Sequence, residues 1–191
     1  MGKPLLSLRH FSRNKDGAAA LEFALLLPLF LILYLCVVEF CQAFMVQRRA
    51  HHSASMMADI VAQAGSVTTQ DLSDFFAVGG LIMMPFSDEP LEGRVSSIKR
   101  GADGRARVEW SHGSKMTRHA VGAVITIPNN LIPTPGDSLI YAETVYKYDS
   151  PFDIQVPGFP DFLSGVTTFK REFYLRPREV ASVSCTNCPK T

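Results

Sequence analysis

An α+β fold is predicted by a change of pattern along the chain. Residues 18–46 form an almost uninterrupted apolar segment, long enough for a helix of many turns. From Arg94 onward, several short stretches show the two-residue alternation that is typical of β-strands. Proline and glycine separate these stretches. We therefore expect a long N-terminal helix that extends into a small domain with an antiparallel sheet.

The composition excludes several classes of protein. The chain has 191 residues, with 19 basic and 18 acidic side chains and a net charge of +1. This length fits one domain, two at most. The near-neutral balance gives no basic excess for nucleic-acid binding, so no nucleic-acid partner is expected. An apolar fraction of 47% argues against disorder, and four cysteines are too few for a disulfide scaffold of this size.

The N-terminal apolar segment is long enough to span a membrane. Residues 23–38 carry no charge, and they lie between Glu22 and Glu39. A transmembrane helix needs about 20 mainly apolar residues. We therefore predict a single-pass transmembrane helix at 18–46, preceded by a basic leader at 1–17 and followed by an exterior domain at 47–191.

The flanking charges predict the orientation of this helix. The leader has a net charge of +3, from Lys3, Arg9, Arg13, Lys15 and Asp16. Arg48 and Arg49 follow the span and oppose this signal, but they are fewer. Because basic flanks favour the cytoplasm, we place the N-terminus inside and 47–191 outside. The apolar core is also too long for a cleaved secretory signal, and its small residues, 17–20, precede the core instead of following it.

Glu22 is the unusual residue of this segment. A carboxylate inside a membrane helix costs about 2.5–3.5 kcal/mol and is usually paired or functional. One explanation is that Glu22 lies at the headgroup level. The other follows from a cut after Gly17, which would make Ala18 the first residue and Glu22 the fifth. The new α-amino group, with a pKa of about 8, would then be available to neutralise Glu22 in the same or a neighbouring chain.

The segment from Gly17 to Phe23, with the sequence GAAALEF, resembles the class III signal of type IV pilins. The wider segment GAAALEFALLLPLFLILYLCVVEF is similar to the N-termini of the TadE-like family of minor pilins, or pseudopilins, of the tight-adherence (Tad) system. Pro28 fits this pattern, and TFKREFYLRPRE (168–179) and DGRARVEWSHG (103–113) are weaker similarities. Asp16 departs from it, since basic residues are more usual beside the glycine.

The resemblance implies a structural role without enzymatic activity, on a pilin-like fold. A prepilin peptidase would cut between Gly17 and Ala18, Glu22 would be the assembly carboxylate and Phe23 the motif aromatic. The implied partners are that peptidase, other Tad pilins or pseudopilins, inner-membrane platform proteins and the membrane. The protein would lie in a bacterial inner membrane with 47–191 in the periplasm, or in an extracellular pilus. The alternative is an uncleaved, membrane-anchored periplasmic scaffold or binding protein.

The remaining elements are predicted from periodicity and turn residues. We expect the first helix to continue over 47–64 with a small-residue stripe against a sheet, ending at Gly65. A second helix is expected over 69–77, capped by Thr69 and ended by Gly79-Gly80. Residues 94–100 and 105–110 form a hairpin with an Asp-Gly turn and Trp110 in the core. Further strands are expected at 120–127, 138–148 and 167–175, with loops at the prolines 128, 133, 135, 151, 157 and 160.

Several cysteine, histidine and glutamate side chains could form a disulfide, a metal site, a catalytic site or an ion pair. In an oxidising compartment, Cys185 and Cys188 are expected to form a local disulfide, with free thiols as the alternative. His51 and His52 are adjacent and so do not chelate a metal as an i, i+4 pair would. A hydrolase that uses His112 or His119 is a weaker alternative, without a Gly-x-Ser-x-Gly motif. No cofactor or metal is expected. Glu39 is predicted to pair with Arg48 or Arg49.

Overall fold

The computed structural model describes residues 17–128, 131–151 and 165–189. The chain divides into two compact units, Met1–Cys41 and Gln42–Thr191, each of which is described by itself. Residues 1–16 of the predicted leader and the loop prolines Pro157 and Pro160 lie outside the described residues.

Helix α2 (Ala18–Gln63) contributes residues to both units and includes Pro28. Its part in the first unit is a candidate membrane span. In the second unit the predicted stripe of small and apolar residues faces the core, with Ala50, Ala54, Met57 and Val61 buried and Ala64 half-buried. Three further residues of the helix are buried beside it: Val46, Ala58 and Ala62. The helix predicted over 47–64 is therefore confirmed, although it ends at Gln63, before Gly65.

A four-stranded antiparallel sheet forms the centre of the second unit. Its strands are β2 (Leu91–Arg100), β3 (Ala106–Ser114), β4 (Ser138–Asp149) and β5 (Val166–Leu175), in the order β3-β2-β4-β5. The predicted hairpin and the strands at 138–148 and 167–175 are confirmed, and with them the α+β class. Gly104 in the hairpin turn has φ +78°, a backbone conformation that favours glycine.

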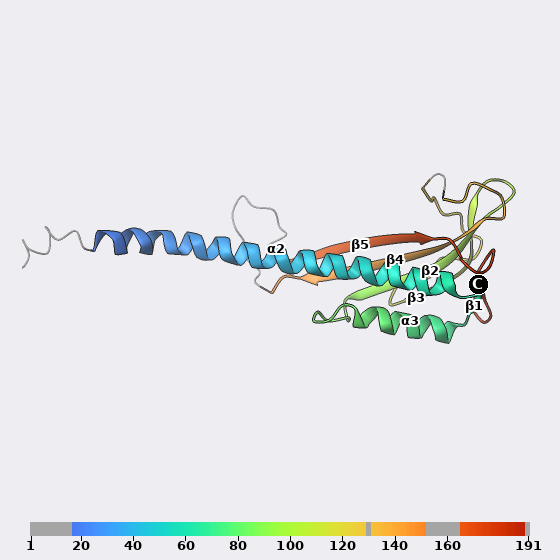
Figure 1. The fold of residues 1–191 in the computed structure, drawn as a ribbon, viewed down its shortest axis with the longest axis horizontal. Coiled ribbons are helices and arrows are strands. Elements are labelled where there is room, and N and C mark those ends of the chain that lie inside the picture. Colours follow the sequence, from blue (N-terminus) through green and yellow to red (C-terminus); the bar gives the residue numbers. More distant parts are fainter. Residues whose placement is uncertain (1–16, 129–130, 152–164, 190–191) are drawn as a thin grey trace, which may run out of the picture. The chain divides into compact units, whose positions relative to one another are not determined.

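The two faces of the sheet bury different sets of apolar side chains. On one face, Val95, Trp110, Ile140 and Ala142 pack with the buried stripe of α2 and with Leu72 of α3 (Thr69–Leu81). Figure 1 shows both helices alongside the sheet. On the other face, Ile98, Leu139 and Tyr141 pack under apolar residues of the segment 125–132. The sheet is thus covered on both sides, which explains why most of β4 is buried.

The buried strand predicted at 120–127 is wrong. This segment makes one isolated bridge, Arg107↔Val124, and its residues are exposed or half-buried. It turns at Gly122, which has φ +80°. Val108 N–H nevertheless donates to Ala123 O at 3.0 Å, and Ile125 N–H donates to Ala106 O at 3.0 Å. The apolar pattern therefore belongs to an irregular segment that covers the edge of β3 and supplies Ile125 and Ile127 to the core.

Helix α3 differs from its prediction at both ends. Thr68, not Thr69, is the N-cap, and its hydroxyl and the Asp71 carboxylate form a capping box. Gly79 and Gly80 do not end the helix, which continues to Leu81. A Cβ at Gly79 would lie 2.9 Å from Ser53 Oγ of α2. The glycine therefore permits a close helix contact, which the Ser53 hydroxyl strengthens by donating to Gly79 O at 3.1 Å.

Candidate functional site

The N-terminal end of α2 is organised around Gly17. Gly17 lies in a turn, and the helix begins at the next residue, Ala18. Leu21 N–H donates to Gly17 O at 3.1 Å, as in the first turn of a helix. A Cβ at Gly17 would meet no described atom within 4 Å, and its φ is outside the left-handed range. Neither packing nor backbone geometry in the described structure therefore requires glycine at this position.

The side chains that follow Gly17 are exposed along the helix. Leu21, Phe23 and Leu25 are 61–74% exposed. Glu22 is exposed as well, and its carboxylate makes no hydrogen bond or ion pair with any described residue. An apolar surface of this length and kind is stable in a bilayer or against other helices. The helix therefore presents the Glu22 carboxylate on an apolar surface that the described residues leave exposed.

The pairing predicted for Glu39 is wrong. Glu39 is fully buried, and neither carboxylate oxygen has a hydrogen-bond partner among the described residues. Arg49 Nη1 instead donates to Ile82 O at 2.8 Å. On a straight helix, nine or ten residues span about 14–15 Å at 1.5 Å per residue, which explains why the arginines do not reach Glu39.

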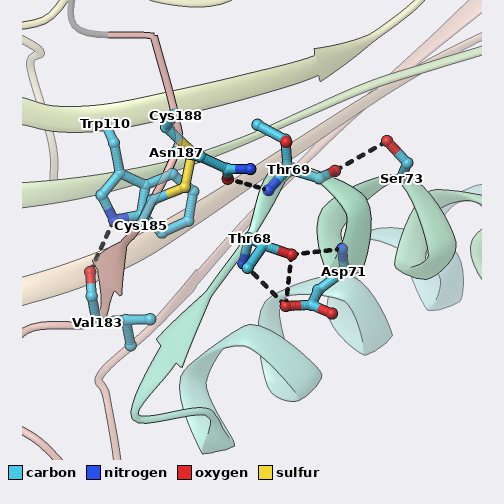
Figure 2. Close-up of a disulfide and its surroundings, with 9 residues drawn as sticks. All are labelled: Thr68, Thr69, Asp71, Ser73, Trp110, Val183, Cys185, Asn187 and Cys188. Carbon is cyan, nitrogen blue, oxygen red and sulfur yellow. Dashed lines mark hydrogen bonds between the residues drawn. A yellow bond between two sulfur atoms is a disulfide. The ribbon is translucent and has the colours of Figure 1, made fainter.

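The C-terminal segment contains a disulfide between Cys185 and Cys188, which closes a local loop. This agrees with the sequence prediction. Figure 2 shows the disulfide beside the N-terminus of α3, where the Asn187 side chain accepts a hydrogen bond from Thr69 N–H at 2.8 Å. Strands β1 (Ser66–Val67) and β6 (Ser184–Cys185), which the sequence analysis missed, pair in parallel. The disulfide loop therefore links the C-terminal segment to the connection between α2 and α3.

Trp110 joins this segment to the sheet. It is 5% exposed, as the core prediction requires, and its indole Nε1–H donates to Val183 O at 2.7 Å. Cys188 and Val183 are buried in the same apolar cluster. Because both a polar bond and apolar packing hold the segment, its position depends on more than the disulfide.

A buried carboxylate, Glu143 of β4, organises the polar part of the opposite sheet face. Its side chain is 4% exposed. Arg94 donates to it from Nε at 3.1 Å and also from Nη2, and Lys170 Nζ lies 2.9 Å away. His119 Nε2 lies at 3.8 Å. Three groups from three different parts of the chain therefore meet at one carboxylate.

These contacts determine the protonation of the cluster. Burial alone would raise the pKa of Glu143, but the hydrogen bonds from Arg94 and Lys170 lower it below its ordinary value. Burial and the charge of Arg94 lower the pKa of His119, despite the attraction of Glu143. Glu143 is therefore ionised and His119 neutral near pH 7. Burial and the neighbouring carboxylates raise the pKa of Tyr141. The ring of Tyr141 stacks on that of Tyr174, with 4.8 Å between the ring centroids.

The histidines considered for hydrolysis are not brought together with a serine. Ser111 Oγ accepts hydrogen bonds from Ser96 Oγ at 2.9 Å and from the His119 backbone N–H at 3.0 Å. Within the described residues, the imidazole of His119 donates to no serine, and that of His112 lies beside Phe76. His51 and His52 are exposed on α2, and no cluster of three metal-ligating side chains occurs in the described part of the chain.

A pocket of about 670 Å³ lies between α2 and β5 within the second unit. Phe44, Gln47, Arg48 and His51 line it from the helix, and Lys170, Arg171 and Glu172 line it from the strand. Sequence reasoning missed both this pocket and the Glu143 cluster. A run of Lys-Arg-Glu in β5 was visible, but the partners of these residues come from distant segments.

Comparison with known protein families gives a match over the N-terminal helix. Residues 17–59 match the model of a family described as TadE-like protein. This confirms the predicted resemblance for the N-terminal helix. No curated protein and no solved structure matches the chain.

Proposed function

We propose that this chain is a minor pilin or pseudopilin that takes part in assembly of a Tad-type pilus and is cut after Gly17 by a prepilin peptidase. The proposal rests on three features that occur together at Gly17 and Ala18. Helix α2 begins at Ala18, the family match begins at Gly17, and the described structure has no packing need for glycine there. A glycine without a role inside the fold is a natural recognition element for a processing enzyme.

The exposed helix surface supports an assembly role. The apolar side chains from Leu21 to Phe40 would be held by the lipid before assembly and by neighbouring helices afterwards. Burial of apolar surface contributes about 25 cal/mol per Å² relative to water, but lipid already supplies much of this. Register between helices therefore has to come from polar groups. Glu22 suits this task, because a carboxylate without a partner is costly in an apolar environment.

Processing would create the partner that Glu22 lacks. A cut after Gly17 leaves a positively charged amine on Ala18, four residues before Glu22. In an assembly of parallel helices, this amine and the carboxylate of a neighbouring chain attract each other strongly at low dielectric. The domain would then remain outside the helical core, where its surface meets other pilins or the inner-membrane platform proteins.

The N-terminal residue of the membrane-extracted protein tests the processing step. We expect intact mass spectrometry to show a chain that starts at Ala18 when a prepilin peptidase is co-expressed and at Met1 when it is absent. Gly17→Ala is expected to keep Met1 with the peptidase present, although the described structure has room for its Cβ. The control Ala20→Ser, in the same segment, is expected to be cut. An intact Met1 in the natural sequence under both conditions would favour an uncleaved, membrane-anchored periplasmic scaffold.

A further inference from the structure

The pocket between α2 and β5 is bordered by an unusual excess of positive charge. Among the described residues, Arg48, Lys170 and Arg171 line it together with one carboxylate, Glu172. His51 adds an imidazole, and Phe44 adds an aromatic side chain. A pocket with this lining favours an anionic ligand that also has an apolar part.

The three cations differ in how far they are already engaged. Lys170 is bound to Glu143 at 2.9 Å and to Glu172 at 3.1 Å, so its charge is largely balanced. Arg171 Nη1 contacts the carbonyl oxygen of Lys170 at 3.4 Å and no described carboxylate. Arg48 is exposed and makes no hydrogen bond or ion pair within the described residues. Two guanidinium groups are therefore available, and their planar donor geometry suits a phosphate.

The position of the pocket along α2 indicates the source of the phosphate. Phe44, Gln47, Arg48 and His51 follow each other at helical spacing and so share one face. Arg48 comes two residues after the predicted end of the span at Val46, about 3 Å along the axis. Lipid headgroups begin where the hydrocarbon core ends. Aromatic and basic side chains are typical of this level, and basic ones there attract anionic lipids.

We propose that this pocket binds the phosphate headgroup of an anionic phospholipid in the outer leaflet of the inner membrane, through Arg48 and Arg171. The proposal rests on the single-pass topology of the proposed function. The bound lipid would hold the domain against the membrane before assembly. Withdrawal of the helix into a filament would remove the pocket from the headgroup layer and release the lipid.

Lipid selectivity of the full-length chain in vesicles tests the proposal. The probe is spin-labelled phosphatidylglycerol, compared with spin-labelled phosphatidylcholine, each added to the leaflet that faces the C-terminal domain. The fraction of immobilised lipid gives a relative association constant by electron paramagnetic resonance. We expect a preference for phosphatidylglycerol that falls up to about fivefold for each arginine removed, the factor that corresponds to ~1 kcal/mol. The variants are Arg48→Gln, Arg171→Gln and the double variant.

The matched control removes two charges from the opposite end of the sheet. Lys99 of β2 lies opposite Arg107 of β3 in the strand register, beside the hairpin turn. Arg105 lies in that turn. Lys99→Gln with Arg105→Gln is therefore expected to keep the preference. An equal loss in this control would assign the effect to net charge and overturn the proposal, as would an unchanged preference in the double variant. If inorganic phosphate displaced the labelled lipid as effectively as unlabelled phosphatidylglycerol does, the pocket would be a site for free phosphate, and the lipid proposal would be overturned. These outcomes are independent of cleavage at Gly17.

Discussion

Glu143 shows at the scale of one residue how this domain combines burial with charge. Its carboxylate is 4% exposed and accepts hydrogen bonds from Arg94 and Lys170. Glu143→Gln keeps the shape of the side chain but removes its charge, so Arg94 loses its carboxylate partner and Lys170 keeps only Glu172. Because hydrogen bonds to charged groups contribute about 1.5–3 kcal/mol, we expect the free energy of unfolding at pH 7 to fall by about 2 kcal/mol. Urea unfolding of the full-length chain in detergent measures it.

The same variant tests the pH dependence of stability. The pKa of Glu143 is lowered in the folded state from an ordinary value of 4.5. The unfolded state therefore binds the proton first, so the stabilisation is present above pH 4.5 and is lost as the pH falls through the lower, folded pKa. Glu143→Gln is expected to remove this part of the acid-induced loss. Exposed Glu89 provides a control, since Glu89→Gln is expected to change neither value; equal behaviour of the two variants would contradict the assignment.

At the scale of elements, the disulfide loop fastens the C-terminal segment to the start of α3. A disulfide that closes so short a loop contributes at most about 2 kcal/mol through chain entropy. Its larger local effect is expected on two hydrogen bonds, Thr186 N–H to Val67 O at 3.0 Å and Thr69 N–H to Asn187. Replacing Cys185 and Cys188 by serine is expected to speed hydrogen exchange at Thr69 and Thr186, measured on the full-length chain.

Two controls separate this effect from general loosening. Cys41→Ser changes a free, exposed cysteine of α2 and is expected to leave exchange at both amides unchanged. Trp110 is held to Val183 O independently of the sulfur atoms, so exchange in the core strands β2 and β4 is expected to remain slow. Unchanged exchange at Thr69 and Thr186 in the double serine variant would mean that packing alone holds the segment.

The elements that the sequence predicted are those whose evidence is local. The buried stripe of α2 and the residue patterns of β4 and β5 each lie within one continuous stretch, where periodicity alone indicates the type of element. The role of Gly79 was misread because glycine is needed there for the close approach of Ser53, a residue that is distant in the sequence. The segment 120–127 was misread because the apolar residues that cover a sheet edge have the same composition as those of a strand.

The candidate sites divide in the same way. The segment from Gly17 to Phe23 is a contiguous motif, so the sequence alone predicted it, and the family match includes it. The Glu143 cluster and the pocket beside α2 are formed by segments that lie at least 24 positions apart in the chain. Only the register of the sheet and the packing of α2 bring them together. Their chemistry was therefore not predictable from spacing.

At the scale of the whole molecule, the central question is what the exposed helix surface requires from its surroundings. Glu22 is the one charged residue between Gly17 and Glu39, and its carboxylate makes no hydrogen bond or ion pair with any described residue. In a bilayer it has access to headgroups and water, so Glu22→Ala is expected to leave membrane insertion unchanged, measured by resistance to alkaline extraction. In the proposed assembly, other helices would enclose the side chain of Glu22. In Glu22→Ala, the amine of a neighbouring Ala18 would then be left buried without a partner. Because breaking one partner of such a pair costs about 3–5 kcal/mol, we expect a strong loss of surface pili in this variant.

Two further substitutions identify the property that matters at this position. Glu22→Gln keeps the size of the side chain and removes its charge, and it is expected to impair piliation as strongly as Glu22→Ala does. Glu22→Asp keeps the charge on a side chain shorter by one methylene, and it is expected to restore part of the piliation. If Glu22→Ala cells instead assemble normal numbers of pili, the pairing between the Ala18 amine and Glu22 is wrong. If Glu22→Gln behaves like the natural chain, the position requires a polar side chain and not a charge, and the proposed ion pair is excluded.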